Sequence, residues 1–183
     1  FHEAVPIEFQ SEAYRIMAQA YQHTFLILTK RPQIMLDRLS LNSDRLDKGN
    51  VWHGLTVCNQ QEWDEKWPIF MQVPGLKFIS HEPALERIDY HLSGSQEDVV
   101  WRRIHGGSYE RSFIACLISG GETGRGARPS HPDIFRADRG QCAASGVPFF
   151  FKGWGTGKQI PMHRGRLLDG RTHDELPWVP KNV

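Results

Sequence analysis

The sequence predicts an α/β fold in which short strands of a parallel sheet alternate with helices. Five short runs are rich in β-branched and aromatic residues, and stretches with helical periodicity lie between several of them. Most of these runs are nearly continuous in apolar residues, as expected of strands buried on both faces of a parallel sheet. Alternation of this kind is typical of βα units. The predicted strands cover residues 24–29, 51–57, 76–80, 114–119 and 147–152.

Four helices are predicted, over residues 8–22, 32–41, 60–71 and 132–144. Pro32 suits the first turn of the second helix, and Gly146 suits the end of the fourth. The periodicity of the first helix defines one apolar face, which we expect to pack on the sheet. That face consists of Phe9, Ala13, Ile16, Met17 and Ala20.

The remaining stretches predict an insertion loop and an irregular tail within one domain. A chain of 183 residues is long enough for one globular domain with a hydrophobic core. Residues 93–110 are polar and glycine-containing, which predicts an insertion loop between the third and fourth strands. Residues 155–183 contain several glycines and prolines and predict an irregular tail that folds back over the domain.

Composition limits the classes of function. The formal net charge of +1 gives no overall field for nucleic acid or an anionic membrane, so nucleic-acid binding is not supported by charge. No apolar run approaches the roughly 20 residues of a membrane span. Three widely spaced cysteines do not form a disulfide framework, which predicts a reducing, cytoplasmic location. Without Cys-x-x-Cys or a His pair at i, i+4, no metal site is expected from this chain alone.

Polar residues follow every predicted strand, where the sites of parallel α/β proteins lie. Lys30, Asn59, Glu82, Glu122 and Lys152 follow the five strands in turn. If the strands lie side by side, these residues form a polar rim, in which Glu82, Lys30 and Lys152 are the candidate catalytic residues. The alternative is that strand ends are polar simply because they meet water.

A glycine-rich segment follows the fourth strand, and two interpretations of it remain open. Closely spaced glycines can turn backbone N–H groups toward an anion, and an arginine can add charged hydrogen bonds. The segment lacks the Lys-Ser/Thr of a P-loop and does not fit the dinucleotide fingerprint. It is either a binding site for a small anionic or zwitterionic ligand or a structural turn. The candidate ligand-binding residues are Gly120, Gly121, Glu122, Arg128 and Asn59.

Seven segments, in order, resemble the phage-associated three-Cys-motif family, a domain of unknown function. They are TFLILTKRP (24–32), NVWHGLTV (50–57), EPAL (82–85), GGETG (120–124), ARP (127–129), GVPFFFK (146–152) and LLDGRT (167–172). The resemblance covers nearly the whole chain. It departs at Cys58, where the family usually has an acidic residue, at His81, where it has a small residue or cysteine, and at Gly153, where it has glutamine.

The resemblance implies a radical SAM-like protein with a partial TIM barrel. An N-terminal three-cysteine motif of that family would bind a [4Fe-4S] cluster and S-adenosylmethionine, and this motif would precede Phe1. The chain also opens at Phe1 and leads at once into helical patterning, which predicts a missing start. We therefore expect a C-terminal portion of a longer protein, which holds no cofactor alone.

The first functional hypothesis is that the full-length protein is a radical SAM-like enzyme and that this chain supplies cofactor and substrate walls. Lys30 and Lys152 or Arg128 would hold a carboxylate or phosphate, while Glu82 and Glu122 would accept hydrogen bonds from an amine or ribose hydroxyl. The alternatives are a noncatalytic binding module and a degraded remnant with an exposed sheet edge. The sequence does not indicate an oligomeric state.

Overall fold

The structure is a computed structural model that describes residues 1–40, 49–92, 114–157 and 165–177. The described elements, in chain order, are α1 (Ile7–Gln19), β1 (Phe25–Thr29), α2 (Pro32–Ser40), β2 (Val51–Val57), α3 (Gln60–Phe70), β3 (Leu76–His81), β4 (Ile114–Gly120), α5 (Pro132–Ser145) and β5 (Phe149–Gly153). The predicted insertion loop at 93–110 lies outside the described residues.

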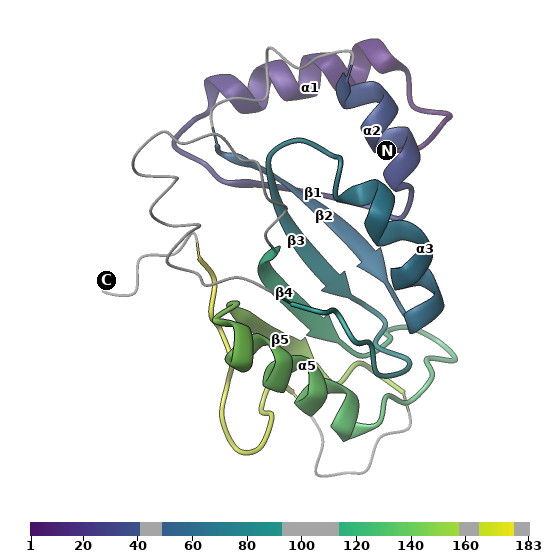
Figure 1. Cartoon of the computed structure of the whole chain (residues 1–183), viewed down its shortest axis with the longest axis vertical. Helices are drawn as coiled ribbons and strands as arrows, with labels where there is room; N and C mark the ends of the chain where they lie inside the picture. The colour runs from purple at the N-terminus through teal and green to yellow at the C-terminus, as the bar shows by residue number, and fades with distance from the viewer. Residues whose placement is uncertain (41–48, 93–113, 158–164, 178–183) are drawn as a thin grey trace.

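The five strands form one parallel sheet in sequential order, β1-β2-β3-β4-β5 (Figure 1). The predicted α/β class with a parallel sheet is therefore confirmed. Each strand adds to the edge left by the one before it, so every carboxyl end lies at the same edge of the sheet. A sheet of this kind neither requires nor excludes closure into a barrel, and the partial barrel stays a prediction.

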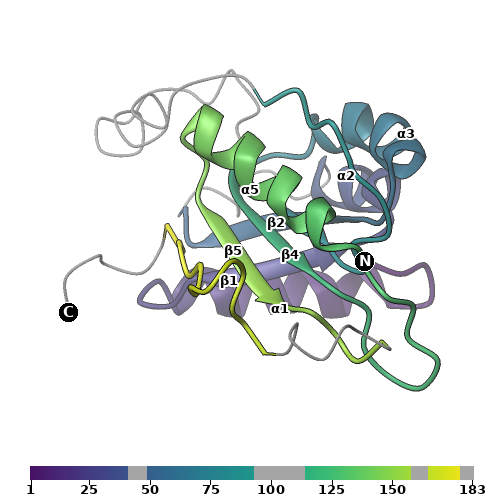
Figure 2. The same ribbon diagram turned by 90° about the horizontal axis from the view of Figure 1, so that it is seen from below.

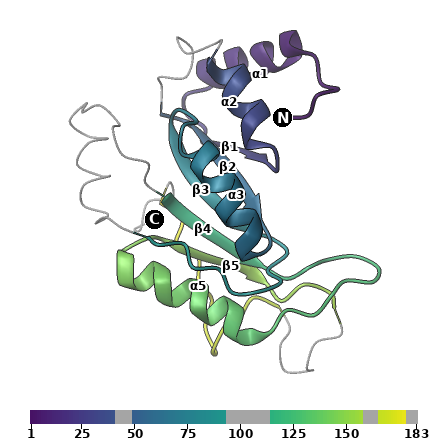
Figure 3. The same ribbon diagram turned by 45° about the vertical axis from the view of Figure 1, so that its right-hand side comes forward.

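Helices α1, α2, α3 and α5 pack on one face of the sheet, which we call the helix face. Figure 1 shows α1 and α2 near β1, and Figure 3 shows α5 alongside β4 and β5. Right-handed crossovers between sequential parallel strands place every connecting helix on the same side. Buried Met17, Met35, Trp63 and Phe135 of these helices join one core cluster with strand residues such as Leu117.

The opposite face, called the far face, has a separate apolar cluster. Its buried residues are Trp52, Leu76, Phe78, Ala115 and Cys116, against which Leu176 of the tail packs. Side chains alternate between the two faces along each strand. The far face is therefore covered in part by the chain's own C-terminal segment.

Residues 173–176 cover the outer edge of β5 (Figure 2). The Phe151 N–H donates to the His173 carbonyl at 2.9 Å, and the Glu175 N–H donates to the Phe149 carbonyl at 3.2 Å. This described part of the tail thus folds back on the sheet and supplies partners for backbone groups that an edge strand would leave exposed.

The packing face of α1 differs from the predicted one. Tyr14 and Met17 are buried, whereas Phe9 is 67% and Ile16 is 52% exposed. The Tyr14 hydroxyl lies 2.9 Å from Nε2 of His53 in β2, and the Asn50 side chain donates to the Met17 carbonyl at 2.9 Å. These polar contacts fix the rotation of the helix, so the prediction that Phe9 and Ile16 face the sheet was wrong.

None of the helices in the described part of the chain has both the length and the apolar character that crossing a membrane requires.

The burial of His53 predicts a pH dependence of stability. Its Nδ1 lies 2.8 Å from the Pro74 carbonyl, and burial lowers the pKa of His53 from 6.5 to about 4. Between pH 6.5 and about pH 4, His53 is therefore protonated in the unfolded chain and neutral in the folded chain. The free energy of unfolding falls as the pH drops through this range. We expect a loss of about 3 kcal/mol between pH 7 and pH 4. Urea unfolding of wild type and His53→Gln at both pH values measures it.

The exposed His2→Gln variant, with a side chain in solvent, serves as the control and should keep the wild-type pH dependence. If His53→Gln showed the same fall in stability as wild type, the assignment to His53 would be wrong.

The outer edge of β1 predicts concentration-dependent association. Among the described residues no strand lies beyond β1, and Leu26 and Leu28 are 38% and 45% exposed. An exposed edge strand with apolar side chains is a template for pairing with another chain. We expect wild type to associate and Leu28→Lys to weaken the association about tenfold, as measured by sedimentation. Leu167→Lys, at a 54% exposed leucine of the tail, should change nothing, and equal effects of the two variants would contradict the prediction.

Candidate ligand pocket at the carboxyl ends of the strands

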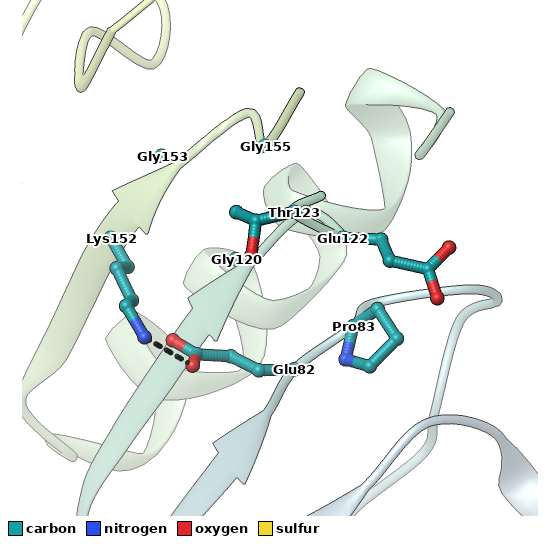
Figure 4. Close-up of a pocket in the computed structure, with 9 residues that line it drawn as sticks. Glu82, Pro83, Gly120, Glu122, Thr123, Lys152, Gly153 and Gly155 are labelled. Atoms are coloured by element: carbon teal, nitrogen blue, oxygen red, sulfur yellow. Dashed lines mark hydrogen bonds and ion pairs between the residues drawn. The ribbon is translucent and has the colours of Figure 1, made fainter. Parts of the chain in front are cut away.

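A pocket of about 320 Å³ lies at the carboxyl ends of β3, β4 and β5 (Figure 4). Glu82 comes directly after β3, and Lys152 lies in β5. Side chains alternate along a strand, so Glu82 lies on the same face as Phe78, the far face, and Lys152 lies on the same face as Phe150. Its lining residues are Glu82, Pro83, Gly120, Gly121, Glu122, Thr123, Lys152, Gly153 and Gly155.

The charged centre of the pocket is an ion pair between Lys152 and Glu82. Lys152 Nζ donates to Glu82 Oε2 at 2.7 Å. The Lys152 side chain is 64% exposed, so solvent screens the pair and its contribution to stability is small. The second oxygen, Glu82 Oε1, is buried and has no hydrogen-bond partner in the described structure. The pocket therefore presents a buried acceptor beside an exposed cation.

Gly120 makes the approach of Glu82 and Lys152 possible. Figure 4 shows both side chains reaching toward each other over Gly120. A Cβ atom at this position would lie 3.2 Å from Glu82 Oε1 and 3.3 Å from Cβ of Lys152. A larger residue would press on both members of the ion pair, so the glycine sets the width of the pocket.

The backbones that follow β4 and β5 touch directly. A Cβ atom on Gly121 would overlap the carbonyl group of Trp154. The Gly121 N–H donates to the Gly153 carbonyl at 2.9 Å, and the Thr156 N–H donates to the Glu122 carbonyl at 2.9 Å. The two loops are thereby held as one wall of the pocket.

Part of the glycine-rich segment is occupied by its own hydrogen bonds. The N–H of Gly121 is used as described above, and the Gly124 N–H donates to the Thr156 hydroxyl at 2.8 Å. These two amides are therefore unavailable to an anion in this conformation. This observation favours the structural interpretation for this part of the segment.

Glu122 is engaged by Arg128 rather than by the pocket. Its carboxylate accepts two hydrogen bonds from the Arg128 guanidinium, at 2.8 and 2.7 Å, and one from the Arg128 backbone N–H at 2.7 Å. These hydrogen bonds lower the pKa of Glu122 from 4.5 to about 2. Figure 4 shows the carboxylate pointing away from the Lys152–Glu82 pair. Glu122 and Arg128 thus brace the loop beside the pocket, and Glu122 is one of the lining residues.

A family model described as a protein of unknown function, DUF5131, matches residues 1–177. The chain belongs to this family. No curated protein and no solved structure matches it. The family description names no activity.

Three predicted site residues of this DUF5131 chain do not line the pocket. Lys30 is exposed at the end of β1, Arg128 pairs with Glu122, and the Asn59 side chain accepts from the Glu62 N–H at 2.8 Å as the N-cap of α3. Burial raises the pKa of the half-buried Cys58 thiol, and the positive charges of Lys30 and Arg128 oppose that rise. The predicted rim is therefore spread along the sheet edge, and the pocket occupies its β3-β4-β5 part.

Four pocket residues were not predicted from the sequence as site residues. Pro83 and Thr123 directly follow the predicted Glu82 and Glu122, Gly153 directly follows the predicted fifth strand, and Gly155 opens the predicted tail. The available signal was the group of glycines at the end of the fifth strand, since closely spaced glycines also stand at the end of the fourth.

The described residues of this DUF5131 chain contain no group of three or more His, Cys, Asp and Glu side chains that could hold a metal ion. Cys116 and Cys142 are buried, and burial raises the pKa of the Cys116 thiol to about 12 and that of Cys142 further. Thiols in such surroundings are poor metal ligands because the thiolate is the ligand form.

The contact between Gly121 and Trp154 predicts that alanine at position 121 lowers the stability far more than alanine at the open position of Gly140. Gly121→Ala should destabilise the protein by roughly 2 kcal/mol or more, because the new methyl group overlaps the Trp154 carbonyl. Gly140→Ala is the matched control, since Gly140 is an exposed position within α5 with nothing near its would-be Cβ. It should be neutral or raise the stability by up to about 1 kcal/mol. Urea unfolding measures both, and equal stabilities of the two variants would refute the close approach.

Proposed function

We propose that this chain supplies the ligand-binding wall of a radical SAM-like, phage-associated enzyme and that the pocket between Glu82 and Lys152 binds a small zwitterionic ligand. The observation that carries the proposal is the buried Oε1 of Glu82, for which the described residues supply no hydrogen-bond partner. Glu82 itself lines a pocket beside the exposed Lys152 side chain. A buried acceptor without a partner costs free energy unless a ligand or water supplies a donor.

The two charges of the pocket match a ligand that carries both signs. A ligand ammonium or hydroxyl group would donate to Glu82 Oε1, and a ligand carboxylate or phosphate would pair with Lys152 Nζ. Charge-assisted hydrogen bonds of this kind are stronger than neutral ones. The glycine backbone of Gly120, Gly121, Gly153 and Gly155 leaves room for the ligand, because no side chain projects from these four positions.

S-adenosylmethionine fits this donor and acceptor set, because its methionine part carries an ammonium and a carboxylate. Glu82 would hold the ammonium and Lys152 the carboxylate, while the backbone wall at Gly121 and Gly155 would shield the ligand from water. The bound cofactor would supply radical chemistry, and the protein supplies binding, orientation and exclusion of water.

A [4Fe-4S] cluster does not fit the described residues, because such clusters need cysteine thiolates and no suitable group is present among them. In the proposed enzyme the cluster ligands therefore come from the three-cysteine motif that the family resemblance implies for the parent protein. The cytoplasmic location predicted from the cysteines remains part of the proposal.

A noncatalytic binding module is the other candidate, and the same pocket favours small molecules as its ligands. Binding of a zwitterion without turnover by the parent protein would select this candidate. The near-neutral net charge gives no support to nucleic acid as the ligand.

Charge removal in the pocket tests the proposal directly. Isothermal titration with S-adenosylmethionine and S-adenosylhomocysteine should show binding to wild type. Glu82→Gln and Lys152→Met should each weaken it at least about tenfold, because each removes one charge-assisted hydrogen bond. Glu8→Gln, which changes an exposed carboxylate on α1, is the matched control and should leave the affinity unchanged.

Unchanged affinity in Glu82→Gln and Lys152→Met would refute the assignment of the pocket. Absence of binding to wild type by both probes, and by free methionine, would refute the zwitterion proposal itself.

A further inference from the structure

A buried polar cluster lies on the helix face directly behind the pocket. It joins Ser119 of β4, Asp138 of α5, His81 of β3 and Tyr90, and each of these residues is at most 2% exposed. The Ser119 hydroxyl donates to Asp138 Oδ2 at 2.6 Å, and His81 Nδ1 lies 2.8 Å from the same oxygen. The Tyr90 hydroxyl donates to Asp138 Oδ1 at 3.3 Å and lies 2.9 Å from His81 Nδ1.

The contacts of the cluster fix the orientation of the histidine. A carboxylate oxygen accepts hydrogen bonds, so the contact with Asp138 Oδ2 assigns the ring proton of His81 to Nδ1. Burial and the neighbouring Asp138 raise the pKa of Tyr90, so its hydroxyl keeps the proton that it donates. His81 Nε2 is buried and has no hydrogen-bond partner in the described part of the chain.

Stability alone does not account for this cluster. Within the described ranges, Asp138 has no Arg or Lys among its hydrogen-bond partners, and removing a carboxylate from water is costly. Well-packed apolar residues at such positions are often as stable or more stable. A buried network in which most polar groups have hydrogen-bond partners holds its residues in one arrangement, because they cannot move without losing hydrogen bonds.

The geometry that the cluster fixes is that of the pocket. His81 immediately precedes Glu82, and Ser119 immediately precedes Gly120, the residue over which Glu82 meets Lys152. Side chains alternate along a strand, so the cluster holds the helix-face side of β3 and β4 while the next residue of each strand faces the pocket. A shift of Asp138 would therefore move the backbone of both pocket residues.

The same face of α5 also holds the segment that follows Glu82. Gln141 donates to the Ile88 carbonyl at 2.7 Å and accepts from the Tyr90 N–H at 2.9 Å, and the Ser145 hydroxyl donates to the Leu92 carbonyl at 3.1 Å. Asp138, Gln141 and Ser145 are spaced three and four residues apart, which places them on one helix face. The second half of this irregular segment, at Ile88, Tyr90 and Leu92, is thus tied to α5.

We propose that Asp138 is a positioning residue for the ligand pocket, acting through Tyr90, His81 and Ser119 to set the place of Glu82 relative to Gly120 and Lys152. The proposal rests on the proposed function, because it assigns the cluster to the ligand-binding geometry of the same pocket. Asp138 itself touches neither the pocket nor its ligand.

The fold offers a matched pair of tyrosines for the test. Tyr90 and Tyr14 are both buried, and each places its hydroxyl 2.9 Å from a buried histidine, but Tyr14 contacts His53 in β2, away from the pocket. Tyr90→Phe and Tyr14→Phe should therefore lower the melting temperature by similar amounts. Only Tyr90→Phe should weaken binding of S-adenosylhomocysteine, by about threefold to tenfold.

A second measurement requires no ligand. The side-chain ammonium resonance of Lys152, assigned by its loss in Lys152→Met, reports the ion pair with Glu82. Tyr90→Phe, Ser119→Ala and Asp138→Asn should shift this resonance, whereas Tyr14→Phe should leave it at its wild-type position. If Asp138→Asn fails to fold, Tyr90→Phe and Ser119→Ala still decide the question.

The two proposals fail in different ways. If wild type does not bind the probe, the proposed function fails, while the Lys152 resonance still tests the positioning role. Wild-type affinity and an unshifted Lys152 resonance in Tyr90→Phe and Ser119→Ala, together with a lowered melting temperature, would mean that the cluster serves stability alone and would overturn the inference.

Discussion

Sequential pairing of five parallel strands is the constraint on which the other features of this fold depend. It brings all carboxyl ends to one edge and places the described helices on one face. Residues distant in sequence, such as Glu82 and Lys152, meet at that edge because β3 and β5 both flank β4. The pocket is therefore a consequence of strand order, and the glycines at the end of β4, Gly120 and Gly121, determine its shape.

At the β4 end, glycine and buried charge act together. Gly120 and Gly121 permit side chains and backbone to approach more closely than any other residue would. On the opposite face, Asp138 gathers hydrogen bonds from β3, β4 and the segment after β3. The pocket thus lies at the carboxyl ends of β3, β4 and β5, and a buried polar network on the helix face holds the strand residues next to it. A rigid backbone behind the pocket suits a binding site that must hold the opposite charges of Glu82 and Lys152 close together.

The sequence predicted the strands well because buried parallel strands are continuous apolar runs that need no knowledge of tertiary contacts. It also predicted that Glu82, Gly120, Gly121, Glu122 and Lys152 lie at the carboxyl edge, and these residues line the pocket. The rotation of α1 could not be predicted, because the hydrogen bond of Tyr14 with His53 overrides the apolar periodicity. Asn59 gave a misleading signal, since a polar residue after a strand is also the N-cap of the next helix. Asp138 gave no signal, because a single carboxylate within a helix is usually on the surface.

The central claim is that the ligand binds between Glu82 and Lys152, and mapping of backbone amide chemical shifts during titration with S-adenosylmethionine tests it most directly. We predict that the largest changes occur at Gly120, Gly121, Thr123, Gly153 and Gly155, with α1 and β1 unaffected. Changes centred on another surface, or none at saturating concentrations, would contradict the claim that this pocket is the functional site.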